Sequence, residues 1–358
     1  MYALIKQDTL SMKAIVTGGT GFIGGKLVEA LVRNGYEVRC LIRKTSNVSR
    51  LKELGVELFL GDLGDLEALR NLPDGGEVVF HLAALVTDWG DADNFYKYNV
   101  LATKELLESS KTHGVKRFVY MSSSTVVWKS DFWNIHKLID IDETYPYTEK
   151  HTDNYNASKT QAEKLVLKYN KNEGLETIVV RPSNVWGAGD TVILPRIAMA
   201  AKKGILYPMG SGERSVTPCH VYNLVNALLL IAENNKAPGN IYFINDGVKI
   251  PYMEFLAKQL SASGIDWTAG FSIPYKFAYA VAAILEVVFK LIKSKKPPVL
   301  TKMAVAVLSG SRSYSIEKAR TELGYKPEVK MDEGIKELKK WVTELGGTDE
   351  LLKHVLKI

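Results

Sequence analysis

The sequence has little of what disulfide-stabilised, metal-binding and membrane-spanning proteins are built from. Only two cysteines, Cys40 and Cys219, occur in 358 residues, and neither has a partner at a spacing typical of zinc or of a redox pair. This usage suits a reducing compartment and predicts no metal. No uninterrupted apolar run reaches the roughly 20 residues that span a bilayer. Residues 1–11 hold only a short apolar patch with no basic region before it, too short for a secretory signal, so we expect a cytoplasmic protein.

The charge distribution excludes a further class of partner. The net charge is +6, from 46 Lys and Arg against 40 Asp and Glu that alternate along the chain. No motif combines basic with aromatic residues, so we expect no nucleic acid partner. With 46% hydrophobic residues the chain can bury a full core. Its length predicts one nucleotide-binding domain and a smaller lobe.

A glycine-rich turn at 16–24 lies near the start of the chain. An apolar run precedes it, and apolar residues at helical spacing follow it at 26–32. Strand, glycine turn and helix in this order are typical of a pyrophosphate site, because the bare turn exposes backbone N–H groups and the helix N-terminus attracts negative charge. The alternative is a glycine turn without a ligand. The residues that we expect at the cofactor here are Gly18, Thr20, Gly21, Phe22 and Ile23.

Strands and helices alternate after this turn. Apolar segments at 37–42, 56–60, 78–84 and 117–121 are typical of strands, and segments of helical spacing separate them. The pattern predicts an α/β fold, a Rossmann-type doubly wound parallel sheet with a smaller C-terminal substrate lobe. We place the NAD(P)-binding domain at 12–185 with a return to the sheet around 215–245, the substrate lobe at 186–214 and 246–345, and terminal extensions at 1–11 and 346–358.

Polar residues after the second and third strands are expected cofactor contacts. Arg43 and Lys44 follow the second strand, where basic residues accommodate a 2′-phosphate and an acid would accept from a 2′-hydroxyl. They favour NADP(H). The alternative is that Arg43 and Lys44 are two solvated loop charges, so NAD(H) stays open. Asp62, with Leu63 beside it, either accepts a hydrogen bond from the adenine amine or caps a helix.

The fourth strand ends in Leu82, Ala83 and Ala84, whose small or apolar side chains let a cofactor lie close to the backbone. His81, in the same strand, is expected to be a structural histidine with satisfied hydrogen bonds and not a catalyst. These residues complete the cofactor contacts expected from this half of the sheet.

Serine, tyrosine and lysine residues suggest the chemistry. Ser122 to Ser124 follow the fifth strand, at the end of the sheet where open α/β proteins bind ligands. Tyr155 and Lys159 are four residues apart and so share one face of a predicted helix. A phenol that exchanges a proton near neutrality needs its pKa lowered from about 10, and a neighbouring ammonium does this. A serine hydroxyl would hold the substrate oxygen.

Four motifs occur in one order: TGGTGFIG at 17–24, SSS at 122–124, YNASK at 155–159 and RPSNVWG at 181–187. Together they resemble the extended short-chain dehydrogenase/reductase family. The resemblance covers nearly the whole chain and implies a Rossmann domain and an NAD(P)-dependent enzyme.

The resemblance also implies roles for single residues. Tyr155 is expected to be the general acid/base, and Lys159 to bind the nicotinamide ribose and tune the tyrosine. Ser124 is expected to orient the reacting oxygen, with Ser123 as the alternative if the alignment is displaced by one residue. Asn99 matches the family's asparagine near the active site, although a capping role explains its spacing equally. Further cofactor contacts are expected at Ser122, Pro182 and Ser183.

The second lobe distinguishes the branches of the family. Sugar-nucleotide members often carry an aspartate after a late histidine-valine pair, where this chain has Asn223. The segments 220–224, 296–301 and 314–327 are similar to the 3β-hydroxysteroid and sterol-4α-carboxylate dehydrogenases, and the last two also to 2-alkyl-3-oxoalkanoate reductases. This similarity implies that a secondary alcohol and a ketone are interconverted on a hydrophobic, steroid-like or long-chain substrate. The alternative is an NDP-sugar epimerase or dehydratase.

Two segments favour an apolar ligand on physical grounds. At 275–292 the only charges, Lys276, Glu286 and Lys290, fall within about 80° on a helix, and lysines follow at 293–296. Such a helix suits a membrane interface or the roof of a lipid-sized pocket, or it is an ordinary core helix. The aromatic residues of the insert between Ser124 and Tyr155 either close over a flat ligand or anchor the loop. They are Trp128, Phe132, Trp133, Tyr145 and Tyr147.

The family resemblance further implies a homodimer, through helices at 100–110 and 155–169. Packing of these helices on the sheet explains their apolar residues equally well.

Overall fold

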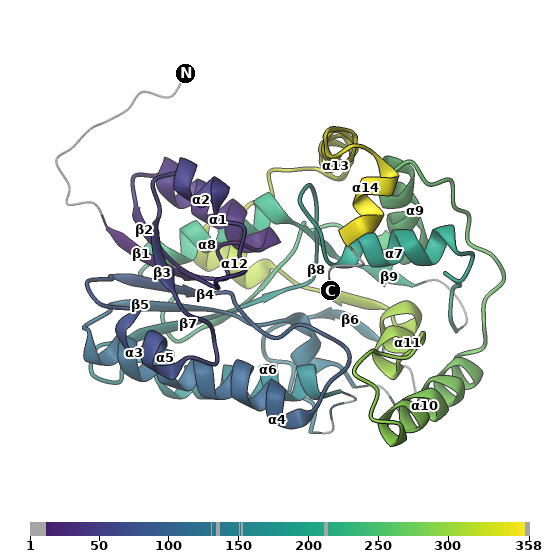
Figure 1. Ribbon diagram of the computed structural model, residues 1–358, viewed down its shortest axis with the longest axis horizontal. Coiled ribbons are helices and arrows are strands. Elements are labelled where there is room, and N and C mark those ends of the chain that lie inside the picture. Colours follow the sequence, from purple (N-terminus) through teal and green to yellow (C-terminus); the bar gives the residue numbers. More distant parts are fainter. Residues whose placement is uncertain are drawn as a thin grey trace.

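The computed structural model describes residues 12–129, 131–133, 137–149, 151, 153–210 and 214–354. They form a large sheet covered by helices and, beside it, a smaller lobe made mainly of helices (Figure 1). The expected N-terminal extension at 1–11 lies outside the described residues.

Seven parallel strands form the large sheet, in the order β11-β7-β5-β4-β1-β2-β3. The chain runs outward from β1 to β3 and then returns to β4 on the other side of β1. Ligands of doubly wound sheets bind at the carboxyl ends of the strands, beside this reversal of order. The predicted fold class is therefore confirmed. The strands are β1 (Lys13–Thr17), β2 (Glu37–Ile42), β3 (Glu57–Leu60), β4 (Val78–His81), β5 (Arg117–Met121), β7 (Glu176–Pro182) and β11 (Ile241–Ile244).

Helices cover both faces of this sheet, which explains why the strands at its centre are mostly apolar and are buried along nearly their whole length (Figure 1). One face carries α1 (Phe22–Arg33), α2 (Ser49–Glu53), α8 (Val221–Glu233) and α12 (Glu317–Leu323). The other carries α3 (Leu66–Asn71), α5 (Ala102–Thr112) and α6 (Asn154–Lys168). Two short elements, α4 (Ala92–Phe95) and the π-helical turn at Tyr96–Leu101, lead into α5.

The smaller lobe combines short strands with helices. Its four-stranded sheet has the order β12-β9-β13-β6, and β8 pairs with β10. Its strands are β6 (Leu138–Ile141), β8 (Asn184–Trp186), β9 (Ser215–Val216), β10 (Pro218–His220), β12 (Ile250–Pro251) and β13 (Arg312–Tyr314). Its helices are α7 (Ile193–Lys202), α9 (Tyr252–Ala262), α10 (Tyr275–Leu291), α11 (Lys302–Ser309), α13 (Met331–Leu345) and α14 (Thr348–Lys353).

The division between the lobes differs in detail from the ranges expected from the sequence. The strand β6, within the expected first domain, pairs with β13 in the small sheet. The helix α12, within the expected substrate lobe, packs on the large sheet through Ala319 and Leu323. In the expected C-terminal extension, Leu351 and Leu352 of α14 join the core of the small lobe. In each case the segment pairs or packs with residues that are distant in the sequence, and a division of the chain into continuous ranges cannot represent such contacts.

The glycine turn is shaped by close backbone contact. Gly18 has a φ of 79°, a conformation that favours glycine. Across the turn, the Gly21 N–H donates a hydrogen bond to Gly18 O at 2.9 Å. Gly24, in the first turn of α1, lies directly against this turn. A Cβ atom at position 24 would lie 2.1 Å from Gly18 O, so only glycine fits there.

We predict opposite effects for two neighbouring substitutions in α1. Gly24→Ala should destabilise the fold by at least about 1–3 kcal/mol, because the methyl group meets backbone that has no room to move. Gly25→Ala should be neutral or stabilising by up to about 1 kcal/mol, since the nearest atom to its Cβ is 3.7 Å away and alanine favours a helix. Urea unfolding followed by circular dichroism measures both. Equal stability of the two variants would contradict the assigned packing.

Candidate active site

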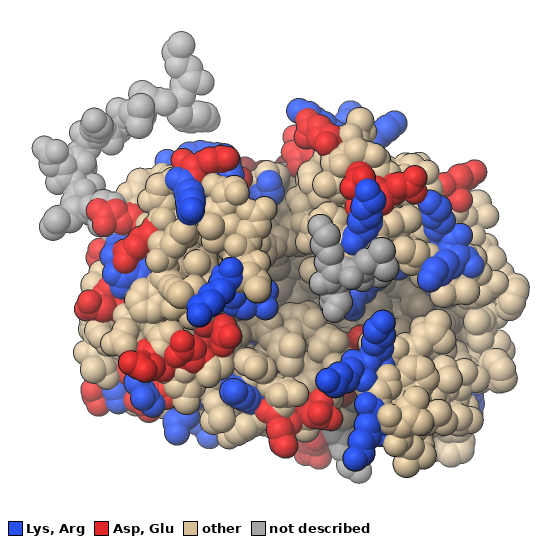
Figure 2. Space-filling model, in the orientation of Figure 1, with Lys and Arg blue, Asp and Glu red and all other residues tan. Residues whose placement is uncertain are grey.

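The helix α6 begins beside the carboxyl end of β5 and carries two of the expected catalytic residues. Asp153 caps it, since its side chain accepts from Asn156 N at 2.8 Å. Tyr155 and Lys159 therefore lie in the first two turns and on one helix face. The face of the molecule in Figure 2 is hollowed between the two lobes.

Ser123 is the serine that meets Tyr155. The Tyr155 hydroxyl forms a hydrogen bond with the Ser123 side chain, whose Oγ also accepts from Thr125 N at 3.2 Å and from Thr125 Oγ1 at 2.9 Å. Ser123 is only partly buried, so a ligand can reach it. The structure thus favours the alternative expectation, displaced by one residue from Ser124.

Ser122 and Ser124 point the other way, into the protein. Ser123 has an extended backbone, with a φ of −154°, and consecutive side chains of an extended chain alternate in direction. Ser124 is buried and hydrogen-bonded to Tyr314. Ser122 is buried and donates to Glu163. Neither hydroxyl faces Tyr155, so the expected role of Ser124 as the group that holds the reacting oxygen is better filled by Ser123.

Lys159 is buried under the site. Its Nζ donates to Met121 O at 2.5 Å and lies 4.4 Å from the centre of the Tyr120 ring. Burial lowers the pKa of Lys159 to about 7, although the nearby Glu163 carboxylate opposes this shift. The ammonium is thus held at the end of β5.

Burial raises the pKa of Tyr155 to about 12, and the hydrogen bond with Ser123 only partly offsets this rise. The expectation that Lys159 lowers this pKa is not met in this structure, because the ammonium points at Met121 O and the Tyr120 ring. The phenol is therefore protonated at neutral pH and suited to donate a proton.

Asn99 fixes the site from a neighbouring element. It is buried in the π-helical turn, where its Oδ1 accepts from Leu85 N at 2.7 Å and its Nδ2 donates to Leu85 O at 3.1 Å. Its Nδ2 also lies 2.9 Å from Ser158 Oγ, next to Lys159. Asn99 thus joins the loop after β4 to the first turns of α6, which a capping role alone does not explain.

His81 is the centre of a buried chain of hydrogen bonds. The Thr103 hydroxyl donates to Asn99 O, so it must accept from the His81 Nε2–H at 3.0 Å. The other ring nitrogen, Nδ1, is then an acceptor for the Thr17 hydroxyl at 2.8 Å. Burial lowers the pKa of His81 to about 3, which keeps the ring neutral. His81 is therefore structural, as predicted, and joins β1 to the Asn99 turn.

The expected cofactor turn forms a cradle of bare backbone. No side chain caps the N-terminus of α1, since its N-cap is Gly21. Thr20 and Gly21 are exposed, and Phe22 and Ile23 partly so, which leaves the first N–H groups of the helix open to a ligand. Across the turn, Gly18 lies so close to the loop after β4 that a Cβ would be 3.0 Å from Ala83 N. These residues fit a dinucleotide pyrophosphate.

The loop after β4 lines the same cradle. Ala83 N donates to Thr17 Oγ1 at 3.1 Å, and Leu82 N to Thr17 O at 3.3 Å. Leu82, Ala83 and Ala84 are partly exposed, with the strand ending at His81. Their position beside Gly18 is the one expected for cofactor contacts.

The expected adenosine contacts lie at the ends of β2 and β3. Arg43 and Lys44 are exposed after β2, and no hydrogen bond or ion pair joins their side chains to another described residue. Asp62 accepts from Gly64 N at 2.6 Å, while the cap of α3 is Asp65. The capping alternative for Asp62 is therefore wrong. Leu63 is partly exposed beside it.

Pro182 is the last residue of β7, and Ser183 follows it. The strand stops at Pro182, as its missing N–H predicts, and Ser183 N donates to Ile244 O at 3.1 Å. The Ser183 hydroxyl donates to Thr217 O. Ser183 thus lies where the two lobes meet.

Comparison with known proteins identifies the family. The model of the 3-beta hydroxysteroid dehydrogenase/isomerase family matches residues 15–275. The chain belongs to this family. It is an oxidoreductase that acts on CH–OH groups, and the family uses a nicotinamide cofactor.

Relatives of known name cover nearly the whole chain. The 2-alkyl-3-oxoalkanoate reductase of Stenotrophomonas maltophilia is 34% identical over 334 residues, which are 92% of this chain and 98% of that protein. The 3beta-hydroxysteroid-dehydrogenase/decarboxylase isoform 1 of Arabidopsis thaliana is 34% identical over 345 residues, 90% of this chain and 77% of that protein. The UDP-glucose 4-epimerase of Thermotoga maritima, solved with UDP-glucose, shares the fold with a TM-score of 0.71 at 23% identity, over 93% of this chain and 99% of its own.

Two features of this 3-beta hydroxysteroid dehydrogenase family member were not expected from the sequence. Glu163 is fully buried and binds Arg181 through Nε at 2.9 Å and Nη2 at 2.6 Å, besides Ser122. Tyr314 receives a hydrogen bond from Trp128 Nε1 at 2.6 Å. The signal for Glu163 was its position four residues after Lys159, a carboxylate on a helix face that is otherwise buried.

Asn223, the residue that favoured the steroid dehydrogenase branch in the sequence, forms hydrogen bonds with none of these groups. Its side chain donates to Asp246 Oδ1 at 2.7 Å and accepts from Glu328 N and Val329 N, both at 2.9 Å. It clamps α8 to the segment before α13 and is structural.

The insert between Ser124 and Tyr155 is anchored to both lobes through some of its aromatic residues. Trp128 is buried, and Tyr147 donates to Glu163 at 2.8 Å. Phe132 packs edge-on against Tyr279 of α10, and Lys276 lies over the exposed Trp133. Tyr145 is exposed.

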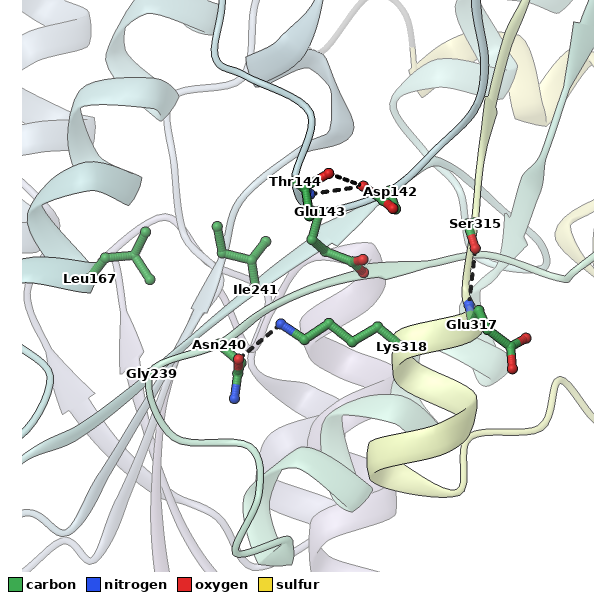
Figure 3. A pocket seen from close by; sticks show the side chains of 10 residues that line it. All are labelled: Asp142, Glu143, Thr144, Leu167, Gly239, Asn240, Ile241, Ser315, Glu317 and Lys318. Carbon is green, nitrogen blue, oxygen red and sulfur yellow. Dashed lines mark hydrogen bonds between the residues drawn. The ribbon is translucent and has the colours of Figure 1, made fainter.

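A separate pocket lies at the β11 edge of the sheet and holds none of the catalytic residues. Its volume is about 440 Å³, and Lys318 Nζ donates across it to Asn240 Oδ1 at 2.8 Å (Figure 3). No helix of the described ranges is long and apolar enough to cross a membrane. Nor do the described residues contain a group of three or more His, Cys, Asp or Glu side chains that could hold a metal.

We predict different effects for substitutions of the two neighbouring serines, one on turnover and the other on stability. Ser123→Ala should lower kcat about 10²-fold or more with an unchanged unfolding temperature, because it removes the partner of Tyr155. Ser124→Ala should keep turnover within about threefold and lose about 1 kcal/mol of stability, the value of its buried bond to Tyr314. Steady-state kinetics and thermal unfolding of both variants provide the comparison. The reverse pattern would return the catalytic role to Ser124.

Proposed function

We propose that the protein transfers hydride between NADP(H) and the carbinol or carbonyl carbon of an apolar substrate, interconverting a secondary alcohol and a ketone. The observation that carries this proposal is the hydrogen bond between Tyr155 and the ligand-accessible Ser123, at the carboxyl end of the sheet and across from the glycine cradle. When bound, the nicotinamide supplies or accepts the hydride.

The chain's own residues supply the proton and hold the oxygen. In the direction of reduction, Ser123 donates a hydrogen bond to the substrate carbonyl oxygen, and the protonated Tyr155 gives its proton to that oxygen. Lys159 lies on the same face of α6 as Tyr155, where an ammonium would stabilise the resulting phenolate. Asn99 positions Lys159 through Ser158 and does not itself touch the substrate.

The preference for NADP(H) rests on Arg43 and Lys44. Both are exposed directly after β2, with no described side chain to neutralise them, and a 2′-phosphate would supply the missing negative charge. No acidic residue follows β2 that would accept from a free 2′-hydroxyl. NAD(H) is the weaker candidate.

The substrate class is supported by the relatives and by the lobe. Two relatives are named for a 3-oxoalkanoate and a 3β-hydroxysteroid, and both names describe an oxygen on an apolar skeleton. Phe132 of the insert and Tyr279 of α10 offer aromatic surface where the insert meets this helix. A sugar-nucleotide epimerase would use the same Ser, Tyr and Lys, and the fold is shared with such enzymes.

We predict that Tyr155→Phe lowers turnover by about 10²–10⁴-fold while cofactor binding changes less than about threefold. The assay follows nicotinamide absorbance with 3β-hydroxysterols, 3-hydroxy fatty acids and the matching ketones, using both NADP(H) and NAD(H), and we expect the lower KM with NADP(H). Tyr169→Phe is the matched control, because its hydroxyl lies at the other end of α6 and bonds Glu108. Retained turnover in Tyr155→Phe removes the tyrosine from the mechanism. Conversion of UDP-glucose at constant absorbance assigns the protein to the epimerases.

We also propose that α10 binds the surface of an anionic membrane. One side of this helix is apolar and exposed, with Phe277 65% and Leu291 77% accessible. Its single acid, Glu286, is turned inward and bonded to Lys302, whose Nζ lies 3.2 Å away. The remaining charges around the exposed side are lysines, which suit anionic headgroups. The expected homodimer has no such support, because the apolar residues of α5 and α6 pack on the sheet, and it stays a prediction.

We predict that the protein sediments with phosphatidylglycerol vesicles, less with phosphatidylcholine vesicles, and less as salt screens the lysines. The double substitution Val287→Asp with Leu291→Asp should weaken binding about tenfold or more, since both side chains are exposed on α10. Ile205→Asp, at an exposed apolar position after α7, is the matched control and should bind as the native protein does. Equal binding of the two variants would assign α10 a purely structural role.

A further inference from the structure

Tyr155 needs a new proton after each reduction. The ketone gains a hydride at its carbon and a proton at its oxygen, and the proton that leaves the phenol is replaced from water. The side chain that bonds the Tyr155 hydroxyl is Ser123. A route from water to the phenol can therefore begin at Ser123.

The titratable groups around Tyr155 are held by other partners. Lys159 donates to a backbone oxygen at the end of β5, Glu163 pairs with Arg181 at 2.6 Å, and the Asp153 side chain caps α6. These bonds engage the three groups in fixing the helix. The hydroxyl groups that follow β5 are therefore the better candidates for moving a proton.

The Ser123 hydroxyl is bonded in turn to Thr125. Thr125 Oγ1 lies 2.9 Å from Ser123 Oγ, and Thr125 N donates to the same oxygen at 3.2 Å. The backbone N–H holds the Ser123 oxygen in place, while the two hydroxyl groups are free to rotate and each can both donate and accept. Tyr155, Ser123 and Thr125 therefore form a chain of three hydroxyl groups in hydrogen-bonding contact.

Thr125 is the outer end of this hydroxyl chain. It is partly exposed, and no other described residue forms a hydrogen bond with its Oγ1, so a water molecule can take the remaining place. The alternate hydroxyl groups, those of Ser122 and Ser124, are buried and bonded within the protein. Of the four consecutive hydroxyl residues, Ser123 and Thr125 are thus the two that are accessible.

We propose that Ser123 and Thr125 carry a proton from water to Tyr155 after each reduction. The phenolate takes the proton of Ser123, Ser123 takes the proton of Thr125, and Thr125 takes a proton from water, which leaves as hydroxide. Three O–H bonds break and three form, with no oxidation or reduction. In alcohol oxidation the chain works in reverse and releases a proton to water. The inference rests on the proposed function, because ketone reduction is what removes the proton, and it adds Thr125 to the residues on which turnover depends.

Two substitutions of Thr125 test the chain. Thr125→Val keeps the shape of the side chain and the backbone N–H but lacks the hydroxyl, whereas Thr125→Ser keeps the hydroxyl. In stopped-flow oxidation of NADPH by a ketone, the first turnover of Thr125→Val should proceed at the native rate, because Tyr155 begins protonated. Its steady-state turnover should be about tenfold or more slower, and Thr125→Ser should stay within about threefold of the native protein in both phases.

An added proton donor separates proton transfer from a structural role. Imidazole buffer, varied at constant pH and ionic strength, should raise the steady-state rate of Thr125→Val and leave the native rate unchanged, because the buffer acid replaces the missing hydroxyl as the proton donor. The unfolding temperature should stay native, since only a partly exposed hydroxyl is lost. If the first and later turnovers of Thr125→Val are slowed alike and imidazole has no effect, Thr125 only shapes the site and the proposal is overturned.

A measurement without turnover keeps this proposal separate from the proposed function. NMR of protein labelled with ¹³Cζ-tyrosine, in mixed H₂O and D₂O with NADP⁺ present, reports the exchange of the Tyr155 hydroxyl proton with water, and Tyr155→Phe assigns the resonance. Exchange should be about tenfold or more slower in Thr125→Val and native in Thr125→Ser, with Tyr169, which bonds Glu108, as the internal reference. If exchange is slowed but no ketone is reduced, the proton route stands and the hydride-transfer function fails. If ketones are reduced but exchange is equal in Thr125→Val and the native protein, the function stands and the role of Thr125 is overturned.

Discussion

The site depends on the buried ion pair between Glu163 of α6 and Arg181 of β7. Both side chains are almost completely buried, so the pair persists only with good geometry and with its remaining oxygens satisfied. Ser122 and Tyr147 provide that satisfaction from β5 and from the insert. One carboxylate therefore fixes α6 against the ends of two strands. Since Tyr155 and Lys159 lie on the same helix, their position over β5 follows from this pair.

A second buried network fixes the position of the cofactor turn, as the ion pair fixes the position of α6. The chain runs from Ala83 N through Thr17, His81 and Thr103 to Asn99 O, and each of the three side chains between its ends accepts one hydrogen bond and donates one. A neutral histidine is required at its centre, which burial ensures. Because Asn99 also holds Ser158, a displacement of the cradle would be transmitted to the helix that carries Tyr155. The cofactor turn and the catalytic helix are thus connected by one continuous series of hydrogen bonds.

Local patterns predicted those parts of the site that depend on neighbours in the sequence. The glycine turn, the strands β2 and β5 and the helical pairing of Tyr155 with Lys159 are set by spacing, and they were predicted correctly. The choice between Ser123 and Ser124 depends on the direction of one extended residue, and a run of three serines carries no information about it. The pairing of Glu163 with Arg181 was missed because the two side chains meet only when α6 packs against β7.

The insert between Ser124 and Tyr155 connects the catalytic side of the molecule with α10. Phe132 of the insert packs against Tyr279, and Tyr275 donates to Asp131 O at 2.5 Å. An apolar substrate resides at a membrane surface, where its skeleton is out of water. A helix that binds that surface and also borders the insert would shorten the substrate's path from the lipid to Tyr155.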